Sequence, residues 1–204
     1  MLSDAVVEGP LPNTWTGLAA FRRLWHEIAP IGRDPRTGGY LRYAFTEPVR
    51  RLEEWFRATA RAGGAHTVES DGNGNLIAWY GPPPERGNAV LLGSHFDSVP
   101  HGGGYDGPLG IVSALLAVRS LLDRAGQPPG ERTQPPPEQA RTPGKPHRHP
   151  GGSTHAPDRH GPGLRRPVGV VAFAEEEGAR FGVPCLGSRL LTGALPAERA
   201  ALLR

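Results

Sequence analysis

The sequence predicts an α/β fold, because two short apolar segments that resemble buried strands are joined by an apolar helix. Residues 88–94 (NAVLLGS) and 168–174 (VGVVAFA) are apolar runs bounded by turn residues, a pattern typical of strands covered on both faces. Residues 109–122 are nearly all apolar, which predicts a buried helix between the two strands. A strand, a helix and a second strand form a βαβ unit, whose ligands bind at the carboxyl ends of the strands.

The residues before this unit predict two amphipathic helices and a strand pair. Residues 15–29 repeat apolar side chains at helical spacing. Residues 46–62 predict a second helix, with Thr46 as a candidate N-cap, Pro48 in the first turn, and Gly63 and Gly64 at its end. Residues 65–69 and 75–80 flank an Asp-Gly-Asn-Gly turn, which predicts a strand, a turn and a strand.

Residues 126–167 differ in composition from the rest of the chain. They contain 11 of the 23 prolines, four of the eight histidines and no aromatic residue, so they cannot bury enough apolar surface to offset the entropy of ordering. We predict a disordered Pro/Gly/His-rich insertion here, which divides the catalytic domain into residues 1–125 and 168–204. Deleting it should leave thermal stability nearly unchanged.

The histidines of this insertion are a candidate metal-binding tract, since short His-rich stretches can bind metals. Their spacing is irregular, however, and no predicted fold supports them, so a solvated loop is the favoured interpretation. The four residues are His147, His149, His155 and His160.

Charge and cysteine content argue against several classes of protein. The net charge is +3, but residues 126–167 contain seven basic and three acidic residues (+4), which leaves the remainder at −1. No basic face for nucleic acid is therefore expected. Cys185 is the single cysteine, so no internal disulfide can form. The chain has no apolar run of about eighteen residues and no secretory signal pattern, so we expect a cytoplasmic protein without a membrane segment.

Ionisable residues gather where the two predicted strands end. His95 and Asp97 follow the first strand, and side chains two residues apart in an extended segment point the same way. An isolated pair of this kind is more often a surface feature. Asp106 follows in a glycine-rich loop, where a helix N-cap is an equally good interpretation.

The second strand is followed directly by three glutamates, residues 175–177. Adjacent carboxylates repel one another unless cations or protons relieve them. Histidine and carboxylate ligands together suit zinc, manganese or a similar ion. A carboxylate shared by two ions, with a free glutamate nearby, is the arrangement that activates a water molecule for hydrolysis. The sequence therefore predicts a two-metal hydrolase site at these strand ends.

Two segments carry a resemblance to a known family: GSHFDSVPHGGGYDGPLGIVSALLAV (93–118) and VVAFAEEEGARFGVPCLGSRLLTGAL (170–195). They resemble the carbamoylase and allantoate amidohydrolase branch of the dinuclear aminoacylase/carboxypeptidase superfamily. Segments 31–45 and 71–81 look most like its allantoate-hydrolysing members. The resemblance implies a partial three-layer α/β/α zinc-hydrolase domain with a mostly parallel sheet. It also implies two divalent metal ions, zinc or manganese, and hydrolysis of a ureido or amide C–N bond in a small molecule such as allantoate or an N-carbamoyl-L-amino acid.

The resemblance implies a role for each site residue. His95 would bind one metal, Asp106 would bridge both, and Glu177 would bind the other. Glu176 would be the general base that takes a proton from the attacking water. Asp97 would orient His95 without touching a metal.

Three further residues of these segments are given no role in the site: Glu175, His101 and Cys185. Glu175 occupies a position that is acidic or amidic in relatives, and it is given no catalytic role. His101 is interpreted as a solvent-facing loop residue, and Cys185 as a buried one.

The chain also departs from the family pattern. Family members are longer, and their second half supplies a histidine in an HxEQG-like motif, a second histidine near the C-terminus, and a smaller domain for dimerisation and substrate binding. No histidine follows Gly182 here. We therefore expect a truncated chain with weak metal retention and little hydrolysis alone. Two alternatives remain: a non-catalytic remnant or a subunit completed by a separately encoded partner, and an aminoacylase or peptidase of the same superfamily.

Overall fold

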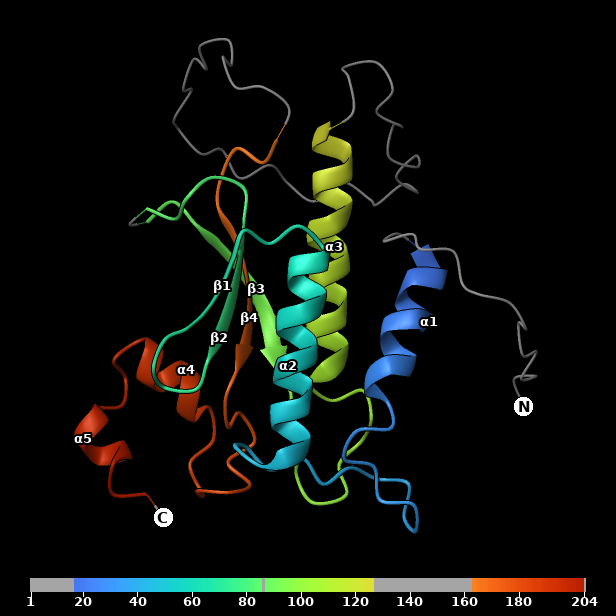
Figure 1. Ribbon diagram of the computed structural model, residues 1–204. Coiled ribbons are helices and arrows are strands. Elements are labelled where there is room, and N and C mark those ends of the chain that lie inside the picture. Colours follow the sequence, from blue (N-terminus) through green and yellow to red (C-terminus); the bar gives the residue numbers. More distant parts are fainter. Residues whose placement is uncertain (1–16, 86, 127–162, 204) are drawn as a thin grey trace, which may run out of the picture.

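The computed structural model describes residues 17–85, 87–126 and 163–203 (Figure 1). The predicted insertion lies almost wholly outside these ranges, and so do its four histidines. The helices are α1 (Gly17–Ile28), α2 (Glu47–Ala62), α3 (Pro108–Gly126), α4 (Leu186–Leu191) and α5 (Ala197–Ala200). The strands are β1 (Thr67–Ser70), β2 (Leu76–Tyr80), β3 (Val90–His95) and β4 (Val168–Phe173).

The four strands form one sheet in the order β1-β2-β4-β3. β3 and β4 pair in parallel, as the predicted βαβ unit requires. β1 pairs antiparallel with β2, and β2 pairs antiparallel with β4. The prediction of a mostly parallel sheet is therefore wrong for the described residues. The short turn after β1 forces the first antiparallel pairing, because a parallel pair needs a long crossover connection.

β3 is an edge strand in the described part of the chain, not a strand covered on both faces. Val90 and Leu91 at its start are 44% and 47% exposed. Only its last residue, His95, is buried. The apolar composition of this segment correctly predicted a strand. The prediction that the strand is buried on both faces was wrong, because burial depends on which strands lie beside it.

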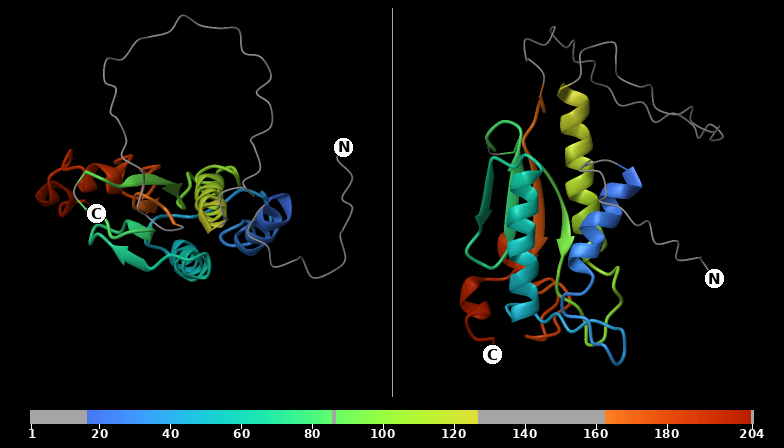
Figure 2. Two further views of the ribbon diagram at one scale, coloured as in Figure 1. Left: turned by 90° about the horizontal axis from the view of Figure 1, so that it is seen from above. Right: turned by 45° about the vertical axis from the view of Figure 1, so that its right-hand side comes forward.

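The helices of the described chain lie mainly over one face of the sheet (Figures 1 and 2). α2 packs against β1 and β2, α3 packs against β3 and β4, and α1 packs against α3. The described residues thus form two main layers, whereas the resemblance implied three. The shared core includes Leu52 and Phe56 of α2, Ile111, Leu115 and Val118 of α3, and Leu76, Ala78, Val168 and Val170 of the sheet. Burying a large apolar side chain of this kind stabilises the fold by about 1.5–3 kcal/mol.

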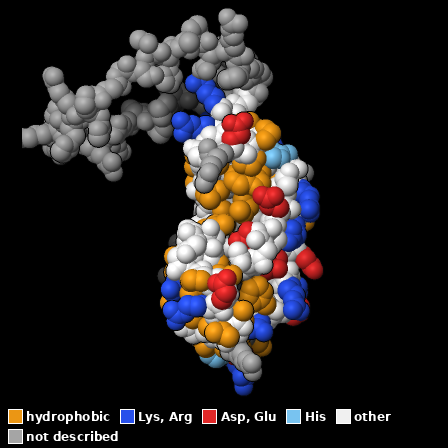
Figure 3. All heavy atoms as spheres, turned by 90° about the vertical axis from the view of Figure 1, so that its left-hand side faces the viewer, with side chains coloured by type: hydrophobic (Ala, Val, Ile, Leu, Met, Phe, Trp, Pro, Cys, Tyr) orange, Lys and Arg blue, Asp and Glu red, His pale blue; other side chains and the backbone are white. Residues whose placement is uncertain are grey.

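A smaller apolar cluster lies on the opposite face of the sheet. It contains Ile77, Trp79 and Val171, with Ala89 and Phe173 packed against it. Those of β2 and β4 alternate along each strand with residues of the main core, as the two faces of a strand require. Figure 3 views the molecule from the left-hand side of Figure 1, where apolar side chains gather between charged ones.

The predicted helix boundaries agree closely with the structure. Thr46 is the N-cap residue of α2, but its hydroxyl donates to the carbonyl of Tyr43 at 2.6 Å instead of capping a helix N–H. Gly64, just after α2, has a φ of 101°, a conformation that favours glycine. α4 was not predicted. No helix in residues 17–85, 87–126 or 163–203 has the length and apolar character needed to cross a bilayer.

The segment between α1 and α2 is tied to the loop that follows β3. The buried side chain of Arg42 donates from Nε to the carbonyl of Ile31 and from Nη2 to the carbonyl of Ile28, at 2.9 and 3.0 Å. Burial lowers the pKa of Arg42 to about 10. The backbone N–H of Arg42 donates to the hydroxyl of Ser98, which itself donates to the carbonyl of Tyr40. These bonds hold the start of the loop after β3 against the segment that joins α1 to α2.

Candidate metal centre

His95 is the last residue of β3 and only 6% exposed. Its Nδ1 lies 3.0 Å from the backbone carbonyl of Asp97. A carbonyl can only accept, so in the neutral ring the proton lies on Nδ1 and Nε2 keeps a lone pair, the form in which histidine binds metals. The Asp97 carboxylate lies farther away, at 3.6 Å. Of the two Asp97 groups near the ring, the backbone carbonyl therefore makes the shorter contact.

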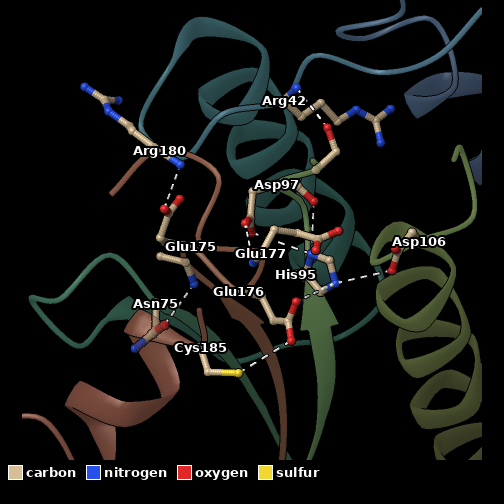
Figure 4. A network of polar contacts seen from close by, with 12 residues as sticks. Arg42, Asn75, His95, Asp97, Asp106, Glu175, Glu176, Glu177, Arg180 and Cys185 are labelled. Atoms are coloured by element: carbon tan, nitrogen blue, oxygen red, sulfur yellow. Dashed lines mark hydrogen bonds and ion pairs between the residues drawn. The ribbon is translucent and has the colours of Figure 1, made fainter. Parts of the chain in front are cut away.

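Carboxylates converge on Nε2 of His95 (Figure 4). Asp106 Oδ1 lies 3.7 Å from it and Glu176 Oε2 lies 3.6 Å from it. One ligand atom from each of His95, Glu176 and Glu177 lies within 4.8 Å of the others. In addition, Glu177 Oε1 is buried and has no hydrogen-bond partner among the described residues. These side chains bring several carboxylates together around one imidazole. Their oxygen and nitrogen atoms are the ligand types that suit a divalent cation such as zinc or manganese.

The ionisation of the cluster shows a shortage of positive charge. Burial raises the pKa of Glu177, and the nearby charge of Asp106 raises it further. Burial lowers the pKa of His95, but the hydrogen bonds and charge of Asp97 and the charge of Glu176 outweigh it, so the pKa lies above 6.5. Without a metal, these groups retain protons more strongly than they would in water.

Asp97 connects the two strand ends. Its Oδ2 accepts the backbone N–H of Glu177 at 3.0 Å, while its backbone carbonyl faces His95. Asp97 is buried, and its Oδ1 has no hydrogen-bond partner among the described residues. Asp97 therefore contacts both His95 and Glu177, but its own carboxylate is not one of the candidate ligands.

The loop between β3 and α3 brings Asp106 to the cluster. Its carboxylate is 62% exposed, so it lies at the open side of the site. The next residue, Gly107, has a φ of 78°. A Cβ atom there would lie 2.6 Å from the backbone oxygen of His95 and 2.7 Å from its ring. Only glycine fits so close to the imidazole.

All five predicted site residues, His95, Asp97, Asp106, Glu176 and Glu177, are thus brought together. His101 is not part of the cluster. It is half-exposed, its Nδ1 lies 3.0 Å from Thr37 Oγ1, and it remains a loop residue.

Cys185 is a neighbour of the site that sequence reasoning missed. Its Sγ lies 3.6 Å from Oε1 of Glu176, and the thiol is only partly buried, so the prediction of a buried cysteine is wrong. Burial raises the pKa of this thiol, and the charge of Glu176 adds to the effect. No sequence pattern signals this contact, because it depends on how the chain folds back after the glutamates.

Known proteins match this chain in both sequence and structure, although no protein-family model does. It is 32% identical over 179 residues to an N-carbamoyl-L-amino acid amidohydrolase from Geobacillus stearothermophilus, covering 86% of this chain and 34% of that protein. It is 30% identical over 167 residues to allantoate deiminase 1 from Glycine max, covering 81% and 27%.

Solved structures show the same relationship. A hydantoinase/carbamoylase family amidase from Burkholderia ambifaria matches with a TM-score of 0.68 and 31% identity, over 91% of this chain and 36% of that one. The chain thus spans about a third of the length of these relatives. In sequence and in fold, the chain is thus similar to the N-terminal part of hydantoinase/carbamoylase family amidohydrolases.

Proposed function

We propose that this chain carries part of the catalytic site of a metal-dependent amidohydrolase that cleaves a ureido or amide C–N bond. The observation that carries the proposal is the convergence of Asp106 and Glu176 on Nε2 of His95, at 3.7 and 3.6 Å. The relatives act on C–N bonds according to their names, which supports the same reaction class here.

The chain's residues divide the work of the site. His95 would hold one ion, Glu177 would hold a second, and Asp106 would be shared between them. Bound divalent ions would polarise the scissile carbonyl and lower the pKa of a water molecule. Glu176 would accept the proton of that water, since its carboxylate is partly exposed and one of its oxygens faces the cluster. The second oxygen of Glu176 contacts the thiol of Cys185, which restricts its rotation.

The substrate would be a small ureido or amide compound. Relatives named as N-carbamoyl-L-amino acid amidohydrolase, allantoate deiminase and ureidoglycolate hydrolase all point to this class. An N-carbamoyl-L-amino acid and allantoate are therefore the two substrates to test first. Zinc and manganese are the metals to supply.

A chimaera tests the proposal. The matched part of the Geobacillus protein would be replaced by this chain, and hydrolysis of both substrates would be measured with each metal. We expect turnover in the chimaera and weak metal binding with little turnover in the isolated chain. A chimaera that folds and binds metal but hydrolyses neither substrate would favour a non-catalytic remnant. Turnover of N-acyl amino acids or dipeptides instead would move the activity to the aminoacylase and peptidase members.

A further inference from the structure

Two buried polar side chains lie behind the candidate metal centre and belong to none of the roles above. They are Asn75 and Glu175, and both are 0% exposed. Burying an amide and a carboxylate costs free energy unless hydrogen bonds compensate for the lost water. The partners of these two side chains therefore indicate what they do for the structure.

Glu175 closes the turn that contains Glu176 and Glu177. Its Oε1 accepts the backbone N–H groups of Arg180 and Phe181, at 2.9 and 2.8 Å. Glu175 has a φ of 52°, in the left-handed region that costs free energy for a residue other than glycine. Its Oε2 is buried without a hydrogen-bond partner among the described residues. Glu175 thus combines a strained backbone with a fully buried side chain that has one bonded and one unpaired oxygen.

Asn75 holds the start of the same segment from the other side. Its Oδ1 accepts the backbone N–H of Ala174 at 3.0 Å. Its Nδ2 donates to the carboxylate of Asp71 at 2.6 Å and to the carbonyl of Gly187 at 2.9 Å. One side chain thus connects the turn after β1, the end of β4 and the helix α4.

A short run of backbone hydrogen bonds completes the support. Gly187 donates to the carbonyl of Ala174 at 2.9 Å, and Leu186 donates to that of Glu175 at 3.0 Å. Cys185 donates to the carbonyl of Glu176 at 2.7 Å. Residue 187 must be glycine, because a Cβ there would lie 2.2 Å from Oδ1 of Asn75. The backbone carbonyls of residues 174–176 are therefore all hydrogen-bonded to the backbone N–H groups of residues 185–187.

We propose that Glu175 and Asn75 are positioning residues, which hold Glu176 and Glu177 in the geometry that binds metal without touching a metal themselves. The carboxylates of residues 176 and 177 repel each other, and a flexible segment would relieve the repulsion by moving them apart. Hydrogen bonds from behind the segment prevent this movement, so that the ligands are arranged before an ion arrives. The inference rests on the proposed metal site.

The test uses the whole chain and four variants: Glu175→Ala, Glu175→Gln, Asn75→Ala and the control Asn73→Ala. Asn73 lies in the same turn as Asn75, but within the described part of the chain its side chain makes a single, long hydrogen bond, to Asp71 at 3.4 Å. Manganese and zinc affinity would be measured by calorimetry. Amide hydrogen exchange of Glu177, whose N–H is bonded to Asp97 and not to Glu175 or Asn75, would be measured without metal.

We expect Glu175→Ala and Asn75→Ala to weaken metal binding about tenfold or more, the loss typical of residues that orient ligands. Exchange at Glu177 should accelerate in both variants. Glu175→Gln should restore both readouts to near wild type, because its carbonyl oxygen can still accept from Arg180 and Phe181. Asn73→Ala should resemble wild type. If Glu175→Ala fails to fold, Glu175→Asp, which keeps the charge but withdraws the acceptor by one methylene, should show the same two losses.

Two outcomes separate this inference from the proposed function. Metal affinity and Glu177 exchange that match the Asn73→Ala control would overturn the positioning roles while leaving the metal site intact. A chimaera that folds but binds neither ion would overturn the proposed function. In that case the exchange of Glu177 alone decides whether Glu175 and Asn75 hold the segment in place.

Discussion

The carboxylate of Asp97 accepts the backbone N–H of Glu177 at 3.0 Å, although 80 residues separate them in the chain. This bond joins the segment that follows β3 to the segment that follows β4. Since the backbone carbonyl of Asp97 also faces Nδ1 of His95, one residue sets the positions of two candidate ligands. The first prediction concerns this residue.

Asp97→Ala should weaken zinc and manganese binding by about tenfold or more, because the Glu177 backbone loses its acceptor. It should also lower the free energy of unfolding by about 1–3 kcal/mol, since the N–H group is left unpaired near the core. Calorimetry and urea denaturation measure the two effects. Asp123→Ala is the control: its ion pair with Arg119 is partly exposed, so its removal should cost no more than about 1 kcal/mol and leave metal affinity unchanged. Equal metal affinity in both variants would contradict the role of Asp97.

Gly107→Ala should displace the imidazole of His95, because the new Cβ would lie 2.7 Å from its ring and the residue has a φ of 78°. We expect a loss of about 1–3 kcal/mol in stability and a clear loss of metal affinity. Gly103→Ala is a matched control in the same loop, since a Cβ atom added there would meet no heavy atom within 4 Å. Similar behaviour of the two variants would show that the ring does not depend on this contact.

Glu176→Gln and Glu177→Ala should separate the base from the ligand in the Geobacillus chimaera. Glu176→Gln should keep its metal but lose turnover by about 10²–10⁴-fold, the contribution of a general base. Glu177→Ala should lose metal, and turnover with it. Metal analysis and single-substrate kinetics distinguish them, with Glu198→Ala on the exposed surface as control. Turnover that persists in Glu176→Gln would mean that another group accepts the proton.

The raised pKa of His95 predicts opposite pH effects on stability and on metal binding. Without metal, the folded-state pKa lies above 6.5, so the charged imidazole stabilises the fold below that pH, and this contribution is lost as pH rises through the folded-state pKa. A metal requires the neutral ring, so metal affinity should increase over the same interval. Unfolding of wild type and His95→Gln, and metal titrations, at about pH 6 and about pH 8 measure both effects. Metal affinity that is equal at the two pH values would argue against His95 as a ligand.

Phe96 connects the site to the core. It is 2% exposed and lies edge-on to Trp55 and Phe56 of α2, with ring centroids 6.3 and 6.2 Å away. Phe96→Ala should cost about 3–5 kcal/mol of stability through the cavity it creates. Thermal or urea unfolding measures the loss, and Leu202→Ala, which is 79% exposed, should change stability by less than about 0.5 kcal/mol. A loss at Phe96 as small as that control would mean that the cavity collapses.

Much of the local structure follows from the sequence. Helical spacing of apolar residues in 15–29 and 46–62 predicts α1 and α2, because burying one face of a helix requires that spacing. The apolar segments around residues 90 and 170 predict β3 and β4 and their parallel pairing. That pairing places His95 and the glutamates at the same end of the sheet, where β3 and β4 both finish. The candidate site residues could therefore be named from the sequence.

Other features depend on contacts between distant parts of the chain. The antiparallel pairing of β2 with β4, the exposed edge at Val90 and Leu91, and the contact of Cys185 with Glu176 join residues that no local pattern relates. The same holds for the network around Asn75 and Glu175. The sequence by itself determined which residues are candidates for the site, because residue type and position at a strand end are local properties. Only the tertiary structure decided how those residues are held, since long-range hydrogen bonds and burial exist only once the chain has folded.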